Sequence, residues 1–109
     1  MSDPDAEFEL YELDVIVEQI TGTCTCAMTV GDYVRIRGGR FSLPEVDGFC
    51  LFALGSVLAL LPAKQRQSDP ADWMETDTRA TCPDPACGLI MRIDRREPKR
   101  FRHGDVSAQ

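Results

Sequence analysis

A chain of 109 residues forms one domain, because two halves would each be too small to bury a hydrophobic core. The formal net charge of −6 argues against nucleic acid as the partner, since binding a phosphate backbone requires a basic surface. No basic segment followed by an apolar run opens the sequence, so we expect no secretory signal and a cytoplasmic protein whose thiols stay reduced.

The two ends of the chain are predicted to be solvated tails around a single domain at residues 10–97. Acidic side chains dominate residues 1–9, and residues 98–109 are basic and polar. The basic residues that cluster toward this end are Arg95, Arg96, Lys99, Arg100 and Arg102. Because the acidic end offsets this cluster, we interpret it as a solvated segment rather than as a docking site.

Three strands are expected in the first half of the domain. Residues 10–20 alternate between apolar and polar side chains, which predicts a strand with one buried face. Residues 33–37 alternate in the same way. The Gly-Gly pair at 38–39 predicts a hairpin turn, because glycine accepts the positive φ that such turns require, and a short strand at residues 40–43 would follow.

The apolar run at residues 49–63 predicts the main helix. Asp47 or Gly48 would cap it, and Pro62 would end it near Leu61. Leucines at helical spacing would form its buried stripe: Leu51, Leu54, Leu58 and Leu61. The run is too short to span a bilayer, so we expect no membrane contact.

Two further strands, at residues 78–82 and 88–95, complete the predicted domain. The fold class is therefore α+β: a small, mostly antiparallel sheet in the order β-β-β-α-β-β, with one main helix packed on one face. The other face of this sheet would have no cover, so self-association as a homodimer through that face is expected.

The five cysteines all fall at the ends of the expected elements. Cys24 and Cys26 follow the first strand, Cys50 lies in the first helical turn, and Cys82 and Cys87 flank the last hairpin. An odd number of cysteines in a reducing compartment argues against a disulfide framework. Neither spacing is that of a C-x2-C zinc knuckle, so spacing alone favours metal binding only moderately.

Two residues at these ends, Cys50 and Asp84, each have two interpretations. The backbone N–H groups at a helix start favour a thiolate at Cys50, the form that binds metals and attacks electrophiles, but a small buried hydrophobic residue is the alternative. Asp84, between two prolines, could be a proton shuttle or an exposed turn residue. The only histidine, His103, lies in the expected tail and is not expected to be a ligand.

Three segments of the chain resemble a family of short prokaryotic proteins of unassigned function. These segments are TGTCTCAMTVGD, GFCLFALGSVLALLP and TCPDPACGLIMRI. The resemblance covers the chain from Tyr11 to about Arg96. It implies that the characteristic cysteines are Cys24, Cys50 and Cys82.

The chain also departs from that family. Cys26 and Cys87 are additions, Met28 stands where the family often has histidine, and Leu51 stands where it often has proline. A missing histidine weakens a mixed cysteine and histidine site, although a thioether could replace it for a soft metal such as Cu(I). The resemblance therefore indicates which cysteines matter and leaves the activity open.

We predict a cysteine-ligated metal site with Cys24, Cys50 and Cys82 at its core. Three cysteines from three separate elements are hard to explain as packing alone. Zinc prefers four ligands, so Cys26, Cys87, water or a small-molecule substrate would complete the site. Zinc is the first expectation, iron (mononuclear or clustered) the second and copper the third. The metal could be structural or could serve chemistry on the substrate.

Two other functions stay open. The first is a metal-free enzyme or redox protein in which Cys50 is the nucleophile, with Asp84 as the other catalytic candidate; no histidine outside the tail could act as its base. The second is a small oligomeric interaction subunit whose cysteines only pack. A thiol of low pKa would favour the first, and unreactive buried thiols would favour the second.

Overall fold

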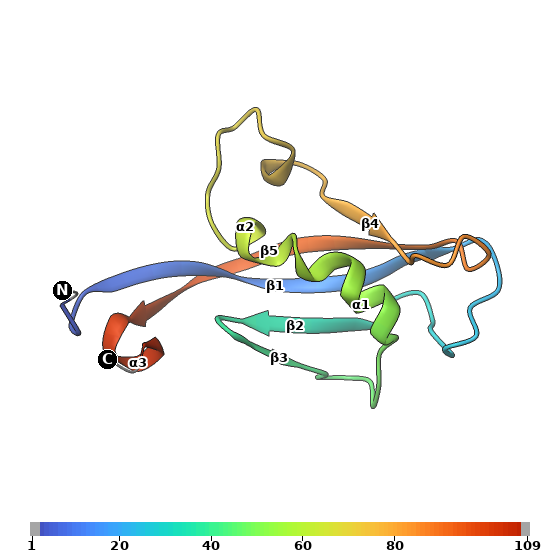
Figure 1. Cartoon of the computed structure of the whole chain (residues 1–109), viewed down its shortest axis with the longest axis horizontal. Coiled ribbons are helices and arrows are strands. Elements are labelled where there is room, and N and C mark those ends of the chain that lie inside the picture. Colours follow the sequence, from blue (N-terminus) through green and yellow to red (C-terminus); the bar gives the residue numbers. More distant parts are fainter. Residues whose placement is uncertain (1–2, 108–109) are drawn as a thin grey trace.

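The computed structural model describes residues 3–107 and contains one five-stranded antiparallel sheet (Figure 1). The strands lie in the order β3-β2-β1-β5-β4. Their bounds are β1 Glu7–Ile20, β2 Tyr33–Arg37, β3 Arg40–Ser42, β4 Arg79–Thr81 and β5 Leu89–Arg102. The helices are α1 Leu51–Leu58, α2 Leu61–Lys64, α3 His103–Val106 and the 3-10 turn η1 Trp73–Glu75. The expected α+β class with an antiparallel sheet is confirmed.

The long strands β1 and β5 form the centre of the sheet. They pair from Glu7 with Arg102 at one end to Ile20 with Leu89 at the other. One face of this pair carries the core, as the alternation in β1 predicted. The largest fully buried apolar side chains are Leu13, Val15, Val17, Val34, Val57, Leu89 and Met91.

The structure corrects the prediction of solvated tails at residues 1–9 and 98–109. β1 already begins at Glu7, and β5 continues to Arg102. Ion pairs connect these strand ends; Arg100, for example, donates to the Glu7 carboxylate at 2.9 Å. Charged pairs on both strands hide the alternation by which a strand is recognised. The two outermost residues of each predicted tail lie outside the described range.

The single helix predicted before Pro62 is divided in two. α1 begins after Cys50 rather than at Asp47 or Gly48, and it ends at Leu58. Pro62 lies in the first turn of α2, where its missing N–H leaves no hydrogen bond unmade. No helix within residues 3–107 is long and apolar enough to cross a membrane.

The buried face of α1 is also narrower than predicted. Only Ala53 and Val57 are fully buried, and they join the core cluster over the sheet. Leu51, Phe52 and Leu58 are exposed. The predicted leucine stripe is therefore wrong for Leu51 and Leu58, whereas Leu54 packs against the core and Leu61 is buried in it.

The opposite face of the sheet carries ion pairs. Glu12 and Asp14 alternate with the core residues of β1, yet both are buried. Arg35 Nε donates to Asp14 Oδ1 at 2.8 Å, and Arg96 Nε donates to Glu12 Oε1 at 3.1 Å. Buried carboxylates require such partners. A charged face of this kind does not favour the self-association that was expected there.

The polar segment after α2 is held against the sheet by the buried Lys64 and by a half-buried ion pair. Lys64 Nζ donates to the carbonyl oxygens of Met74 and Thr76 at 2.8 and 3.0 Å. Arg95 makes a bidentate pair with the Glu75 carboxylate at 2.9 and 2.6 Å. The segment thus folds back by satisfying charged groups rather than by burying apolar area.

We expect the stability of the protein to depend on the ionisation of Glu75. Hydrogen bonds from Arg95 and from the Ser68 N–H lower the pKa of Glu75 from 4.5 to about 2. A carboxyl group whose pKa is lower in the folded state stabilises it above the unfolded pKa, and this stabilisation disappears as the pH falls from about 4.5 to about 2. Urea unfolding of wild type and Glu75→Gln should therefore differ at pH 6 and converge near pH 2. A difference that does not change with pH would contradict the assignment.

Candidate metal centre

All five cysteines line one pocket of about 410 Å³. The segments that line it lie at the end of the sheet far from the chain termini (Figure 1). Three segments that are distant in sequence form it: the loop after β1, the first turn of α1 and the hairpin between β4 and β5. The structure thus brings Cys24, Cys50 and Cys82 to one place, together with Phe52 and Asp84.

Backbone hydrogen bonds hold the loop after β1 against the β4–β5 hairpin. The Gly22 N–H donates to the Cys87 carbonyl oxygen at 3.0 Å, and the Thr23 N–H donates to the Ala86 carbonyl oxygen at 3.1 Å. These bonds continue the pairing of β1 with β5 beyond the end of both strands. As a consequence Cys24 is placed beside Cys87.

Asp84 shapes the turn that carries Cys82 and Cys87. Its Oδ1 accepts from the Ala86 N–H at 3.0 Å, and its carbonyl oxygen accepts from the Cys87 N–H at 3.1 Å. A side-chain acceptor two residues before its donor is the usual role of aspartate in a turn. These contacts give Asp84 a turn-forming role, and its catalytic role stays a prediction.

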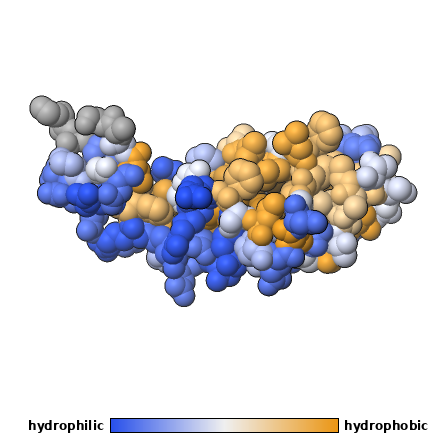
Figure 2. All heavy atoms as spheres, turned by 90° about the horizontal axis from the view of Figure 1, so that it is seen from below, coloured by the Kyte–Doolittle hydropathy of each residue, from blue (hydrophilic) through white to orange (hydrophobic). Residues whose placement is uncertain are grey.

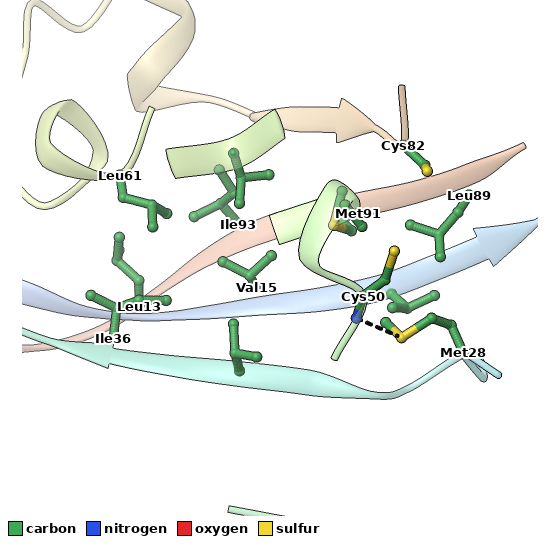
Figure 3. Packing of buried hydrophobic residues seen from close by; sticks show 14 of the residues in the cluster. Leu13, Val15, Met28, Ile36, Cys50, Leu61, Cys82, Leu89, Met91 and Ile93 are labelled. Carbon is green, nitrogen blue, oxygen red and sulfur yellow. Dashed lines mark hydrogen bonds between the residues drawn. The ribbon is translucent and has the colours of Figure 1, made fainter. Parts of the chain in front are cut away.

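Cys50 is held at the start of α1 by Met28. The Cys50 N–H donates to the Met28 Sδ at 3.4 Å (Figure 3). Both residues are buried, so this bond satisfies a backbone donor that the helix itself leaves open. The Met28 thioether, which the sequence suggested as a ligand for Cu(I), thus accepts a hydrogen bond from the backbone.

The environment of Cys50 favours its thiolate. Burial alone would raise the pKa of this thiol, but the backbone N–H groups of Ala53 and Phe52 and the thiols of Cys26 and Cys82 outweigh burial and lower it. The protonated thiol makes no capping hydrogen bond, so these donors act on the charged form. The start of α1 therefore lowers the pKa of Cys50, as the position of this cysteine in the sequence suggested.

The thiols fall into two groups around Cys50 and Cys87. Cys26 and Cys82 neighbour Cys50, and hydrogen bonding to Cys50 is the main cause that raises the pKa of Cys26. Burial, followed by hydrogen bonding to Cys24, raises the pKa of Cys87 to about 11. Cys50 and Cys82 both belong to the core cluster, and Figure 3 shows the Cys50 thiol directed toward Cys82. Cys26, which the resemblance treats as an addition, is thus a direct neighbour of Cys50.

The thiols lie together without forming a finished coordination site. All five cysteines are free. In the described part of the chain, no three Cys, His, Asp or Glu side chains are arranged so that they could hold a metal ion. His103 begins α3 at the other end of the sheet, so it is no part of this pocket (Figure 1).

Comparison of the chain with protein-family models, with curated proteins and with solved structures gives no match. The resemblance to a family of short prokaryotic proteins therefore stays a prediction.

Proposed function

We propose that the protein binds a thiophilic metal ion, zinc first, in the cysteine pocket. The observation that supports this most is the meeting of five cysteines from three distant segments around one space of about 410 Å³. Packing explains one or two buried cysteines, but it does not explain why the loop, helix and hairpin each contribute a thiol to the same wall. Zinc accepts four thiolates in tetrahedral sites.

The four proposed ligands are Cys50, its neighbours Cys26 and Cys82, and Cys24, which the sequence indicated. Cys50 supplies the first thiolate, since its pKa is lowered before any metal is present. Cys87 is the least suitable ligand, because its pKa of about 11 opposes loss of the proton. As a neutral thiol beside Cys24, it would donate a hydrogen bond to a ligand and reduce the negative charge of the site.

Metal binding would close the pocket. Zinc requires sulfur atoms about 2.3 Å from one point, and the free thiols do not have that arrangement. The loop after β1 and the β4–β5 hairpin would move together, while their strand ends stay paired. Each thiol that becomes a ligand loses its proton, so binding should release protons and weaken as the pH falls.

Metal analysis of protein purified without oxygen tests this proposal. We expect about one metal ion per chain and no colour, since zinc has a filled d shell. Charge-transfer absorbance with the same metal stoichiometry would show that the site binds iron or copper instead of zinc. Protein that stays substoichiometric after zinc is added and the excess removed would overturn the proposal.

A metal-free thiol function is the second candidate, and the lowered pKa of Cys50 is the observation that favours it. The rest of the pocket offers room for a small-molecule substrate. Iodoacetamide rates, resolved by residue with mass spectrometry, should show Cys50 reacting at lower pH than Cys87 in the reduced, metal-free protein. A pKa of Cys50 above that of free cysteine would exclude the metal-free thiol function. Protection of Cys50 by one equivalent of zinc would favour the metal site instead.

The same proposal places the protein in the cytoplasm and makes it a metal-binding protein. A cysteine-ligated zinc site with free thiols fits the reducing cytoplasm. Whether the ion is structural or acts on a small molecule depends on its fourth position: a site with Cys26 as fourth ligand is closed, and a site with water there is open. The metal content of Cys26→Ser distinguishes the two, because only a closed site should lose affinity.

A further inference from the structure

α1 turns an uncharged face to solvent. Leu51 is 72% exposed, Phe52 is 68% exposed and Leu58 is 52% exposed. The whole helix, LFALGSVL, contains no charged residue. Figure 2 shows apolar residues gathered over the half of the molecule away from the termini, while the end that carries the termini is hydrophilic. Contiguous apolar patches of this kind on soluble proteins mark interaction sites.

We propose that this face joins two copies of the chain, with α1 of one copy packed antiparallel on α1 of the other. Gly55 lies at the middle of the exposed face, and the space where its side chain would stand is open. Leu51 and Phe52 lie one turn before Gly55, and Leu58 lies one turn after it. A two-fold axis at Gly55 therefore places Leu51 of one copy against Leu58 of the other.

Charge complementarity favours a second copy over an unrelated partner. Antiparallel helices place the positive N-terminal end of one dipole beside the negative C-terminal end of the other. Arg40 is the first residue of β3 and lies near the C-terminal end of α1. There it lines a pocket of about 260 Å³ together with Leu58. Asp47 lies just before the N-terminal end. Within the described residues neither has a partner of opposite charge, and the two-fold axis brings the two together.

The interface also meets the cysteine pocket. Phe52 belongs to the exposed face of α1 and at the same time lines that pocket. Association of two copies would bury Phe52 and narrow the mouth of the pocket. The dimer does not rest on the proposed metal site, since it is argued from α1 alone, and metal content can be measured on the same variants.

Sedimentation velocity of the full chain, from about 1 to about 100 μM, tests the proposal. Wild type should associate to a dimer. Leu51→Glu and Leu58→Glu should each raise the dimer Kd by roughly a hundredfold, because the two-fold interface contains every substitution twice. Val106→Glu is the matched control: this residue is 54% exposed but lies in α3, so its variant should behave as wild type.

Charge reversal tests the orientation. Arg40→Asp and Asp47→Arg should each raise the dimer Kd by about fivefold, and the double variant should restore it. Wild type that is monomeric over the whole range would overturn the proposal, and co-sedimentation of such a monomer with lipid vesicles would assign the face to a membrane instead. Dimers that survive both glutamate variants would place the interface elsewhere and also overturn it.

Discussion

Replacing Cys50 with serine is expected to lower the metal affinity by about a hundredfold to a thousandfold. Structural zinc sites bind with an apparent free energy of roughly 10–16 kcal/mol, so each of four ligands contributes about 2.5–4 kcal/mol. Cys50 is the thiol that the helix start prepares as a thiolate. Competition with a chromophoric chelator measures the loss, and the metal-dependent increase in the unfolding midpoint should disappear with it.

Cys87→Ser is the control for this experiment. Cys50 and Cys87 line the same pocket and are similarly buried, at 7% and 4% exposure, so a general packing defect would affect both variants alike. Because the pKa of Cys87 is raised to about 11, its variant should keep the full metal content and lose affinity by no more than about tenfold. Equal loss in both variants, or full retention in Cys50→Ser, would contradict the ligand assignment.

The sheet could be predicted from sequence because alternation is a local property. Where one face of a strand is apolar and the other polar, as in β1 around Leu13 and Val15, the pattern shows directly. Where ion pairs replace apolar contacts, as between Glu7 and Arg100, the pattern vanishes and the sequence predicts tails instead of strand ends. An apolar run also does not say which side of a helix is covered, so Leu51 was expected in the core and lies in solvent.

The site could be predicted only in outline. Cysteines at the ends of neighbouring elements indicated that the thiols could meet, and the pocket contains all of them. Their pairing could not be predicted, because it depends on the path of a loop. Ala27, directly after the turn at residues 25–26, has a left-handed φ of 56°. Cys26 lies beside Cys50, while Cys24 lies beside Cys87. The contact of Met28 with Cys50 depends on the same loop.

Gly22→Ala is expected to reduce the free energy of unfolding by about 2–4 kcal/mol and to weaken metal binding with it. A methyl group at this position would overlap the Ala86 carbonyl oxygen and lie 2.9 Å from the Cys87 carbonyl oxygen. Both obstacles are backbone atoms, so no rotamer change relieves them. The hairpin must move away, which breaks the hydrogen bonds from Gly22 and Thr23 that place Cys24 beside it.

Gly39→Ala is the matched control, because nothing lies within 4 Å of the added methyl group and the position does not have a positive φ. Its free energy of unfolding should stay within about 0.5 kcal/mol of wild type. Urea unfolding of the metal-free variants measures the structural cost, and chelator competition then measures the cost to the site. If Gly22→Ala lost stability but bound zinc with the affinity of wild type, the junction between loop and hairpin would matter to the fold and not to the cysteine pocket.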